Sequence, residues 1–164
     1  MRVGSTLRVG SKCAKFPTQV LFPLLFKALF IYNFTNYIDW PNPGSTFVIA
    51  VYGDSPIISE LQAISKIKKV ASATIEVRKI NSIPEIGNAK IVFVSAPKKR
   101  FVTEINKATL DKSILIVSDG ATSDFGINFL EINGKQSFQI SKSNIEKHGL
   151  KVSNSLLSLG VTVN

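Results

Sequence analysis

The order of apolar and polar residues predicts a chain in which helices and strands alternate. Apolar side chains recur at helical spacing from Leu24 to Asp39, and Trp40-Pro41 ends this helix because a residue before proline avoids the helical conformation. Short apolar runs predict strands at residues 46–52, 90–96 and 113–118, and alternation of apolar and polar residues predicts another at 74–80. Helical patterns lie between them at residues 57–67 and 97–110, and a last helix is expected to carry Leu156, Leu157 and Leu159.

A turn signal and a helix signal follow one another in the last third of the chain. Asn133-Gly134 separates apolar runs at 127–132 and 136–140, and this dipeptide favours a tight β-hairpin turn. Ser143 and Glu146 have the spacing of a capping box, which predicts a short helix that Gly149 can end.

Strands that are apolar along their whole length are typical of a sheet covered on both faces. The predicted fold class is therefore α/β: a Rossmann-like, mainly parallel sheet with helices on both faces and an antiparallel C-terminal hairpin. Residues 26–164 are expected to form a single domain, because no linker or repeat divides them. Residues 1–25 are interpreted as a leader or disordered segment, whose basic start and apolar stretch match the remnant of an export signal.

Much of the positive charge lies near the start of the chain. The net charge is +9, and the basic residues that precede Asp39, the first acidic residue, are Arg2, Arg8, Lys12, Lys15 and Lys27. They leave 15 basic against 11 acidic residues, a balance of +4 for the remainder. That remainder contains no zinc-finger spacing and no RNA-binding aromatic signature, so no nucleic-acid partner is expected.

The chain has too few cysteine and histidine residues to form an internal disulfide or a metal site built from them. Cys13 is the only cysteine and His148 is the only histidine. An internal disulfide, a cysteine-based zinc site and a catalytic triad with a second histidine are therefore excluded. We expect neither a metal nor a cofactor, and we expect His148, just before Gly149, to favour the end of a helix.

Two segments that follow predicted strands are candidates for binding a phosphate or another anion. The loop Gly53-Asp54-Ser55-Pro56 has one glycine where a nucleotide site needs several, and its carboxylate would repel phosphate. Lys98, Lys99 and Arg100 open a predicted helix, where they form either an anion site on free backbone N–H groups or a solvated basic turn.

The loop Asp119–Gly126 follows another predicted strand, at a place where α/β sheets often bind ligands. Its carboxylates, Asp119 and Asp124, suit a cation or an acid/base pair. However, Asp-Gly and Ser-Asp are also ordinary turn sequences. A small-molecule-binding or hydrolytic α/β domain that uses this loop is one of two functions that the sequence leaves open.

The first helix and the residue after it are unusually aromatic. Their aromatic side chains are Phe26, Phe30, Tyr32, Phe34, Tyr37 and Trp40, and they occupy much of the helix circumference. A helix that is apolar on all sides is buried or lies at an interface, and the sequence does not decide between these roles.

The segment Lys27–Pro41, KALFIYNFTNYIDWP, resembles the opening motif of the YfiR-like family. The family order continues through FVIAVYG at 47–53, IVFVS at 91–95, ILIVSD at 114–119, GINF at 126–129 and FQIS at 138–141. The segment Gly149–Leu157, GLKVSNSLL, resembles the closing motif, so the resemblance covers roughly residues 26 to 160.

The resemblance implies a non-enzymatic periplasmic regulator of cyclic-di-GMP signalling. Its partner is expected to be a membrane protein with a periplasmic sensor region, a diguanylate cyclase or a sensor kinase, and a homodimer is also implied. Together with the aromatic helix, the resemblance suggests Phe34, Asp39 and Trp40 as surface contacts for the partner. The best-known member of the family has disulfides, which this chain cannot form internally.

Thermal unfolding is expected to be unchanged by a reductant or a chelator, because one cysteine and one histidine cannot build a covalent or metal staple. Thermal melts of the purified protein with and without each reagent check this expectation. A fall of several degrees on adding chelator would contradict it.

Overall fold

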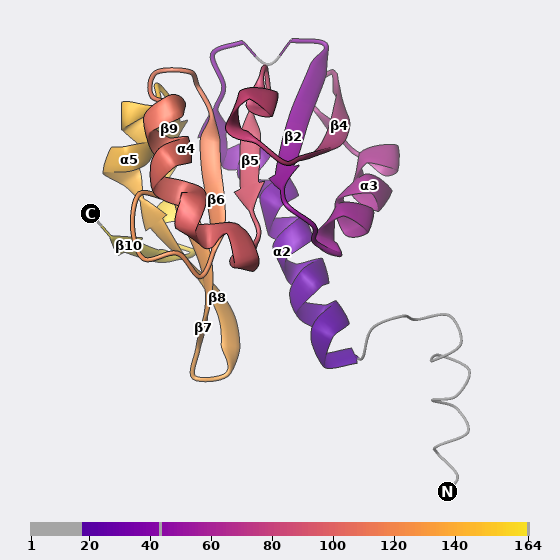
Figure 1. The fold of residues 1–164 in the computed structure, drawn as a ribbon, viewed down its shortest axis with the longest axis vertical. Helices are drawn as coiled ribbons and strands as arrows, with labels where there is room; N and C mark the ends of the chain where they lie inside the picture. Colours follow the sequence, from indigo (N-terminus) through magenta and orange to yellow (C-terminus); the bar gives the residue numbers. More distant parts are fainter. Residues whose placement is uncertain (1–17, 43, 164) are drawn as a thin grey trace, which may run out of the picture.

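The continuous apolar runs of the sequence become the central strands of an eight-stranded sheet (Figure 1). The computed structural model describes residues 18–42 and 44–163 of the chain. In spatial order the strands of the sheet are β10 (Val161–Val163), β8 (Lys135–Ser141), β7 (Ile127–Ile132), β6 (Leu115–Asp119), β5 (Ile91–Val94), β2 (Thr46–Tyr52), β4 (Ala73–Ile80) and β3 (Lys69–Val70). The predicted α/β fold class, mainly parallel with an antiparallel hairpin, is confirmed.

Strand β2 shows why these runs are apolar without interruption. Phe47, Ile49 and Val51 point into a core on one face of the sheet. Val48 and Ala50 point into a second core on the other face. Because successive side chains of a strand point to opposite faces, a strand with a core on each side needs an apolar residue at every position.

Five neighbouring strands, β4, β2, β5, β6 and β7, run parallel to one another. Their order in space corresponds to 2-1-3-4-5 in chain order, which places the switch point of the sheet between β2 and β5. We call the edge at which β2, β4, β5 and β6 end the carboxyl edge; their last residues are Tyr52, Ile80, Val94 and Asp119. The opposite edge is the amino edge.

Helices cover both faces of the sheet, as predicted. Helices α2 (Thr18–Tyr37) and α3 (Ile57–Ile67) supply side chains to the first core, and η1 (Ile83–Ile86) and α4 (Val102–Ala108) supply them to the second. Within the first core, the Phe34 ring stacks on Phe129 with centroids 6.0 Å apart and meets Phe138 edge-on at 5.5 Å. None of the helices in the described residues is long and apolar enough to span a membrane.

Helix α2 begins earlier than the sequence pattern predicts. Residues 18–25, which were assigned to the leader, are its first turns, and residues 1–17 lie outside the described part of the chain. The region 97–110 also differs, because it starts as the 3₁₀ helix η2 (Ala96–Phe101) before α4 continues to Ala108.

The cap of the next helix is two residues earlier than the sequence predicts. Helix α5 (Lys142–Lys147) is capped by Ser141, whose Oγ accepts a hydrogen bond from the N–H of Asn144 at 3.4 Å. Ser143 therefore lies inside the helix, and the predicted Ser143–Glu146 capping box is wrong. The reason is that Ser141 is the last residue of β8, so the chain turns into the helix directly from the strand.

The last helix, α6 (Asn154–Leu157), carries Leu156 and Leu157 as expected but ends before Leu159, and Ser153 is its cap. It is followed by β10, which the sequence pattern does not predict. β10 pairs in parallel with β8 at the edge of the sheet.

The hairpin between β7 and β8 has the backbone conformation that Asn-Gly predicts. Asn133 has φ 52° and Gly134 has φ 77°, and a side chain at position 134 would meet nothing within 4 Å. Both residues are thus in the left-handed region that favours asparagine and glycine.

Gly134→Val is expected to lower the free energy of unfolding by about 1 kcal/mol or more, through backbone strain alone, because a β-branched residue tolerates positive φ poorly. Chemical denaturation of the purified variant measures this loss. Gly134→Asn is the control, since asparagine adopts this conformation readily, and an equal loss in both variants would show that strain at φ is not the cause.

Candidate functional site

Two segments from opposite ends of the described chain meet on the surface. Strand β1 (Ile38–Asp39), which directly follows α2, pairs antiparallel with β9 (Lys151–Val152) in a separate two-stranded sheet. Ile38 lies opposite Val152 and Asp39 lies opposite Lys151. The N–H of Ser153 donates to the carbonyl oxygen of Tyr37 at 2.9 Å, which extends the pairing by one bond.

The two faces of this small ribbon differ in polarity. Ile38 is buried and Val152 is half-buried against the first core, whereas Asp39 and Lys151 are exposed. Among the described residues, none of the three salt bridges joins Asp39 to Lys151. We call the depression of about 390 Å³ around them the β1–β9 surface; its residues are Asn36, Tyr37, Ile38, Asp39, Lys151, Val152 and Ser153.

Trp40 anchors the ribbon to the first core. Its indole Nε1–H donates to the carbonyl oxygen of Thr35 at 3.1 Å, and its ring meets Phe47 edge-on with centroids 5.0 Å apart. The side chain is only 9% exposed. Trp40 therefore fixes where β1 leaves α2, and its ring contributes little area to the surface itself.

Residues 25–161 match the YfiR/HmsC-like family. The chain belongs to this family. None of the curated proteins compared with the chain matches it. The family is known for regulating cyclic-di-GMP signalling, is periplasmic, and has a regulatory rather than an enzymatic role.

The family motifs are brought together by the fold of this YfiR/HmsC-like domain. The opening motif, Lys27–Pro41, contains β1, and the closing motif, Gly149–Leu157, contains β9. Sequence reasoning proposed Asp39 but missed Lys151, Asn36 and Ser153 as its neighbours. The two motif sequences were the only signal that could have found them, since a two-residue strand has no measurable periodicity.

Phe34 does not lie at the surface of the YfiR/HmsC-like domain. Its side chain is 0% exposed and packs between Phe129 and Phe138. The interpretation of Phe34 as a surface contact is thus corrected, because a fully buried ring has no area to offer a partner. Its influence on partner binding, through the position of α2, stays a prediction.

The basic segment after β5 is spread over several neighbours. The Lys99 Nζ lies 3.9 Å from the place that a Cβ on Gly120 would occupy, while the Arg100 guanidinium lies 4.8 Å from the centroid of the Phe101 ring. The Lys98 Nζ lies 5.7 Å from the same centroid. Lys98 and Arg100 thus share the Phe101 ring, whereas Lys99 lies beside Gly120, and an anion bound at these residues remains a prediction.

The loop after β2 is closed by the protein's own side chains. A Cβ on Gly53 would lie 2.8 Å from the Cγ of Lys98, so the lysine stem covers the switch point of the sheet. Asp54 forms an ion pair with Lys79, and a hydrogen bond from this lysine together with its charge lowers the pKa of the Asp54 carboxyl. A pyrophosphate would have to displace Lys98 and approach a carboxylate.

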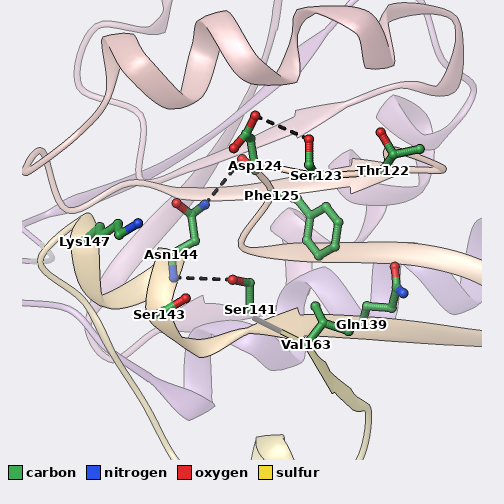
Figure 2. A pocket seen from close by; sticks show the side chains of 10 residues that line it. All are labelled: Thr122, Ser123, Asp124, Phe125, Gln139, Ser141, Ser143, Asn144, Lys147 and Val163. Atoms are coloured by element: carbon green, nitrogen blue, oxygen red, sulfur yellow. Dashed lines mark hydrogen bonds between the residues drawn. The ribbon is translucent and has the colours of Figure 1, made fainter.

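The loop Asp119–Gly126 separates its two carboxylates. Asp119 forms a salt bridge of 2.9 Å with Lys27, whereas Asp124 accepts a hydrogen bond from the Thr103 hydroxyl at 2.8 Å. Asp124 also lines a polar cavity of about 320 Å³ (Figure 2), and Asp119 is not among its lining residues. The residues that line the cavity are Thr122, Ser123, Asp124, Phe125, Gln139, Ser141, Ser143, Asn144, Lys147 and Val163.

His148 ends α5, as the sequence predicts, and its side chain is buried. Its Nδ1 lies 2.8 Å from the carbonyl oxygen of Asn144, and its Nε2 lies 3.1 Å from the Thr109 hydroxyl. The ring therefore joins α5 to the end of α4. Within residues 18–42 and 44–163, no group of three His, Cys, Asp or Glu side chains is placed to hold a metal ion.

Phe34→Ala is expected to lower the free energy of unfolding by about 3–5 kcal/mol, because it leaves a cavity in the first core. Leu29→Ala is the matched control on the same helix, since Leu29 is 44% exposed and its loss should cost less than about 1 kcal/mol. Denaturant melts of both variants make the comparison. Equal stability of Phe34→Ala and the wild type would mean that α2 is not held by this ring.

Proposed function

We propose that this YfiR/HmsC-like protein is a non-enzymatic periplasmic regulator that binds the periplasmic part of a membrane-bound diguanylate cyclase through the β1–β9 surface. The observation that carries this proposal is the pairing of β1 with β9, which presents residues of both family motifs on one exposed patch. Burial in the core explains why Ile38 and Trp40 are apolar. Asp39 and Lys151 are exposed, and folding does not require their charges.

The chemistry of the patch suits a protein partner. Exposed charges of opposite sign lie side by side, so a complementary partner has to present a basic and an acidic group in a fixed order. Such an arrangement contributes more to orientation and association rate than to raw affinity. Tyr37 adds a half-buried aromatic ring at the same place, and aromatic residues often carry a large share of the binding energy of interfaces.

Phe34 and Trp40 take an indirect part in this proposal. Both are buried under the ribbon or beside it, so they hold α2 and β1 in position for the exposed residues. A homodimer and a sensor kinase in place of the cyclase remain compatible with the same surface.

A second candidate function is the binding of a small polar molecule in the cavity of Figure 2. The cavity volume of about 320 Å³ lies within the range of ligand sites, and the mainly polar lining suits a polar rather than an apolar molecule. A hydrolytic role for the loop is less well supported, since Asp119 is engaged by Lys27 and does not line the cavity. This candidate predicts that changes at β1–β9 have no effect on function.

Asp39→Lys and Lys151→Glu are each expected to reduce capture of the cyclase by roughly ten-fold, because each places like charges across the interface. The tagged full-length variants are incubated with membranes from the source cells, and the captured cyclase is identified and quantified by mass spectrometry. Cellular cyclic-di-GMP is measured in parallel, and loss of binding should change it in the same direction as deletion of the regulator.

The matched controls are Glu104→Lys and Lys107→Glu, which make the same charge changes on exposed positions of α4, over the other face of the sheet. Melting temperatures of all four variants should equal that of the wild type. If the controls lower capture as much as the β1–β9 variants, or if no cyclase is captured by the wild type, the proposal fails.

A further inference from the structure

The carboxyl edge of the sheet gathers basic side chains from several elements. Lys98, Lys99 and Arg100 follow β5 at this edge, and Lys79 lies at the end of β4. Lys27 reaches the same edge from α2, where its Nζ lies 2.9 Å from the carboxylate of Asp119. Cations from both faces of the sheet therefore meet where the parallel strands end.

The acidic residues of this edge neutralise only part of that charge. Asp119 is paired with Lys27, and Asp54 is paired with Lys79. None of the salt bridges among the described residues includes Lys98, Lys99 or Arg100. These three residues leave a surplus of positive charge on the carboxyl edge, and Lys99 and Arg100 are exposed.

Exposed apolar side chains lie on two elements that extend beyond this edge of the sheet. Leu25, in the part of α2 that precedes Lys27, is 43% exposed, and Ile132 at the tip of the β7–β8 hairpin is 39% exposed. Phe129 pairs with Asp119, the last residue of β6, so Ile132 lies three residues further along β7, roughly 10 Å beyond the edge. Figure 1 shows that the start of α2 and the β7–β8 turn extend past the same end of the sheet.

We propose that the carboxyl edge docks on a lipid bilayer that contains anionic phospholipids. Lys98, Lys99 and Arg100 would lie against the lipid phosphates, while Leu25 and Ile132 enter the interfacial region beside them. Two separate apolar projections at the same edge as a cluster of cations match an anionic surface with an apolar interior. A nucleic acid would match the positive charge, but it has no apolar interior that Leu25 and Ile132 could enter.

This docking does not depend on a protein partner. Helix α2 runs from the carboxyl edge, where Lys27 contacts Asp119, toward β1 at its other end. The β1–β9 surface thus lies away from the proposed contact with the bilayer and stays accessible when the carboxyl edge is docked. A bilayer-bound regulator would search for a membrane partner in two dimensions rather than three.

Cosedimentation of the full-length protein with vesicles tests the proposal without any other protein. The wild type is expected to bind vesicles of phosphatidylcholine and phosphatidylglycerol more tightly than vesicles of phosphatidylcholine alone, and added salt should weaken the binding. The combined change Lys98→Gln, Lys99→Gln and Arg100→Gln should weaken binding about five-fold per charge, roughly a hundred-fold in total.

A triple lysine variant at the amino edge is the matched control. Lys66→Gln, Lys68→Gln and Lys69→Gln remove the same charge from exposed positions at the end of α3 and in β3, and should change binding much less. Likewise, Leu25→Ser with Ile132→Ser should weaken binding, whereas Ile67→Ser, at a residue that is 78% exposed near the amino edge, should not.

All variants keep residues 1–17, which contain the basic residues Arg2, Arg8, Lys12 and Lys15. A difference between variants therefore does not come from this basic segment. Equal binding by the carboxyl-edge and control variants, or equal binding to both kinds of vesicle, overturns the proposal. Because the vesicles hold no cyclase, this result leaves the proposed function at β1–β9 to its own test.

Discussion

The packing of Phe34 between Phe129 and Phe138 is the contact on which the rest of the molecule depends. It fixes α2 against one face of the sheet, and both ends of that helix then have fixed positions. The C-terminal end of the helix leads into β1, whose direction is held by Trp40. The N-terminal half brings Lys27 to Asp119 at the carboxyl edge. One buried aromatic cluster thus positions two separate surfaces.

The central strands could be predicted because their burial leaves a local signature. Strands such as β2 and β5 have a core on each face, so they are apolar at each buried position and stand out from the polar loops around them. The β7–β8 turn was predictable for another local reason, since Asn133-Gly134 suits the positive φ of that turn. These features depend on a few neighbouring residues and little on the rest of the fold.

The parts that sequence reasoning missed depend on distant residues. β1 and β9 contain two residues each, and neither is a strand without the other. An aromatic side chain on α2 has the same sequence appearance whether it faces the sheet, as Phe34 does, or the surface. Ser141 and Ser143 are equally good caps by type, and only the end of β8 selects the first. The candidate surface was therefore half predicted: Asp39 came from the opening motif, and Lys151 required the fold.

The lysine stem over Gly53 has a consequence for how this architecture is used. In open α/β sheets the gap between the loops at the switch point commonly accepts a ligand. Here the aliphatic part of Lys98 lies where even one added carbon on Gly53 would clash, so the space is already filled from within. The ammonium group of the same side chain lies 5.7 Å from the centroid of the Phe101 ring, at the carboxyl edge. The strand order is one that commonly holds a ligand, yet here the segment that fills the crevice also supplies the basic residues of the carboxyl edge.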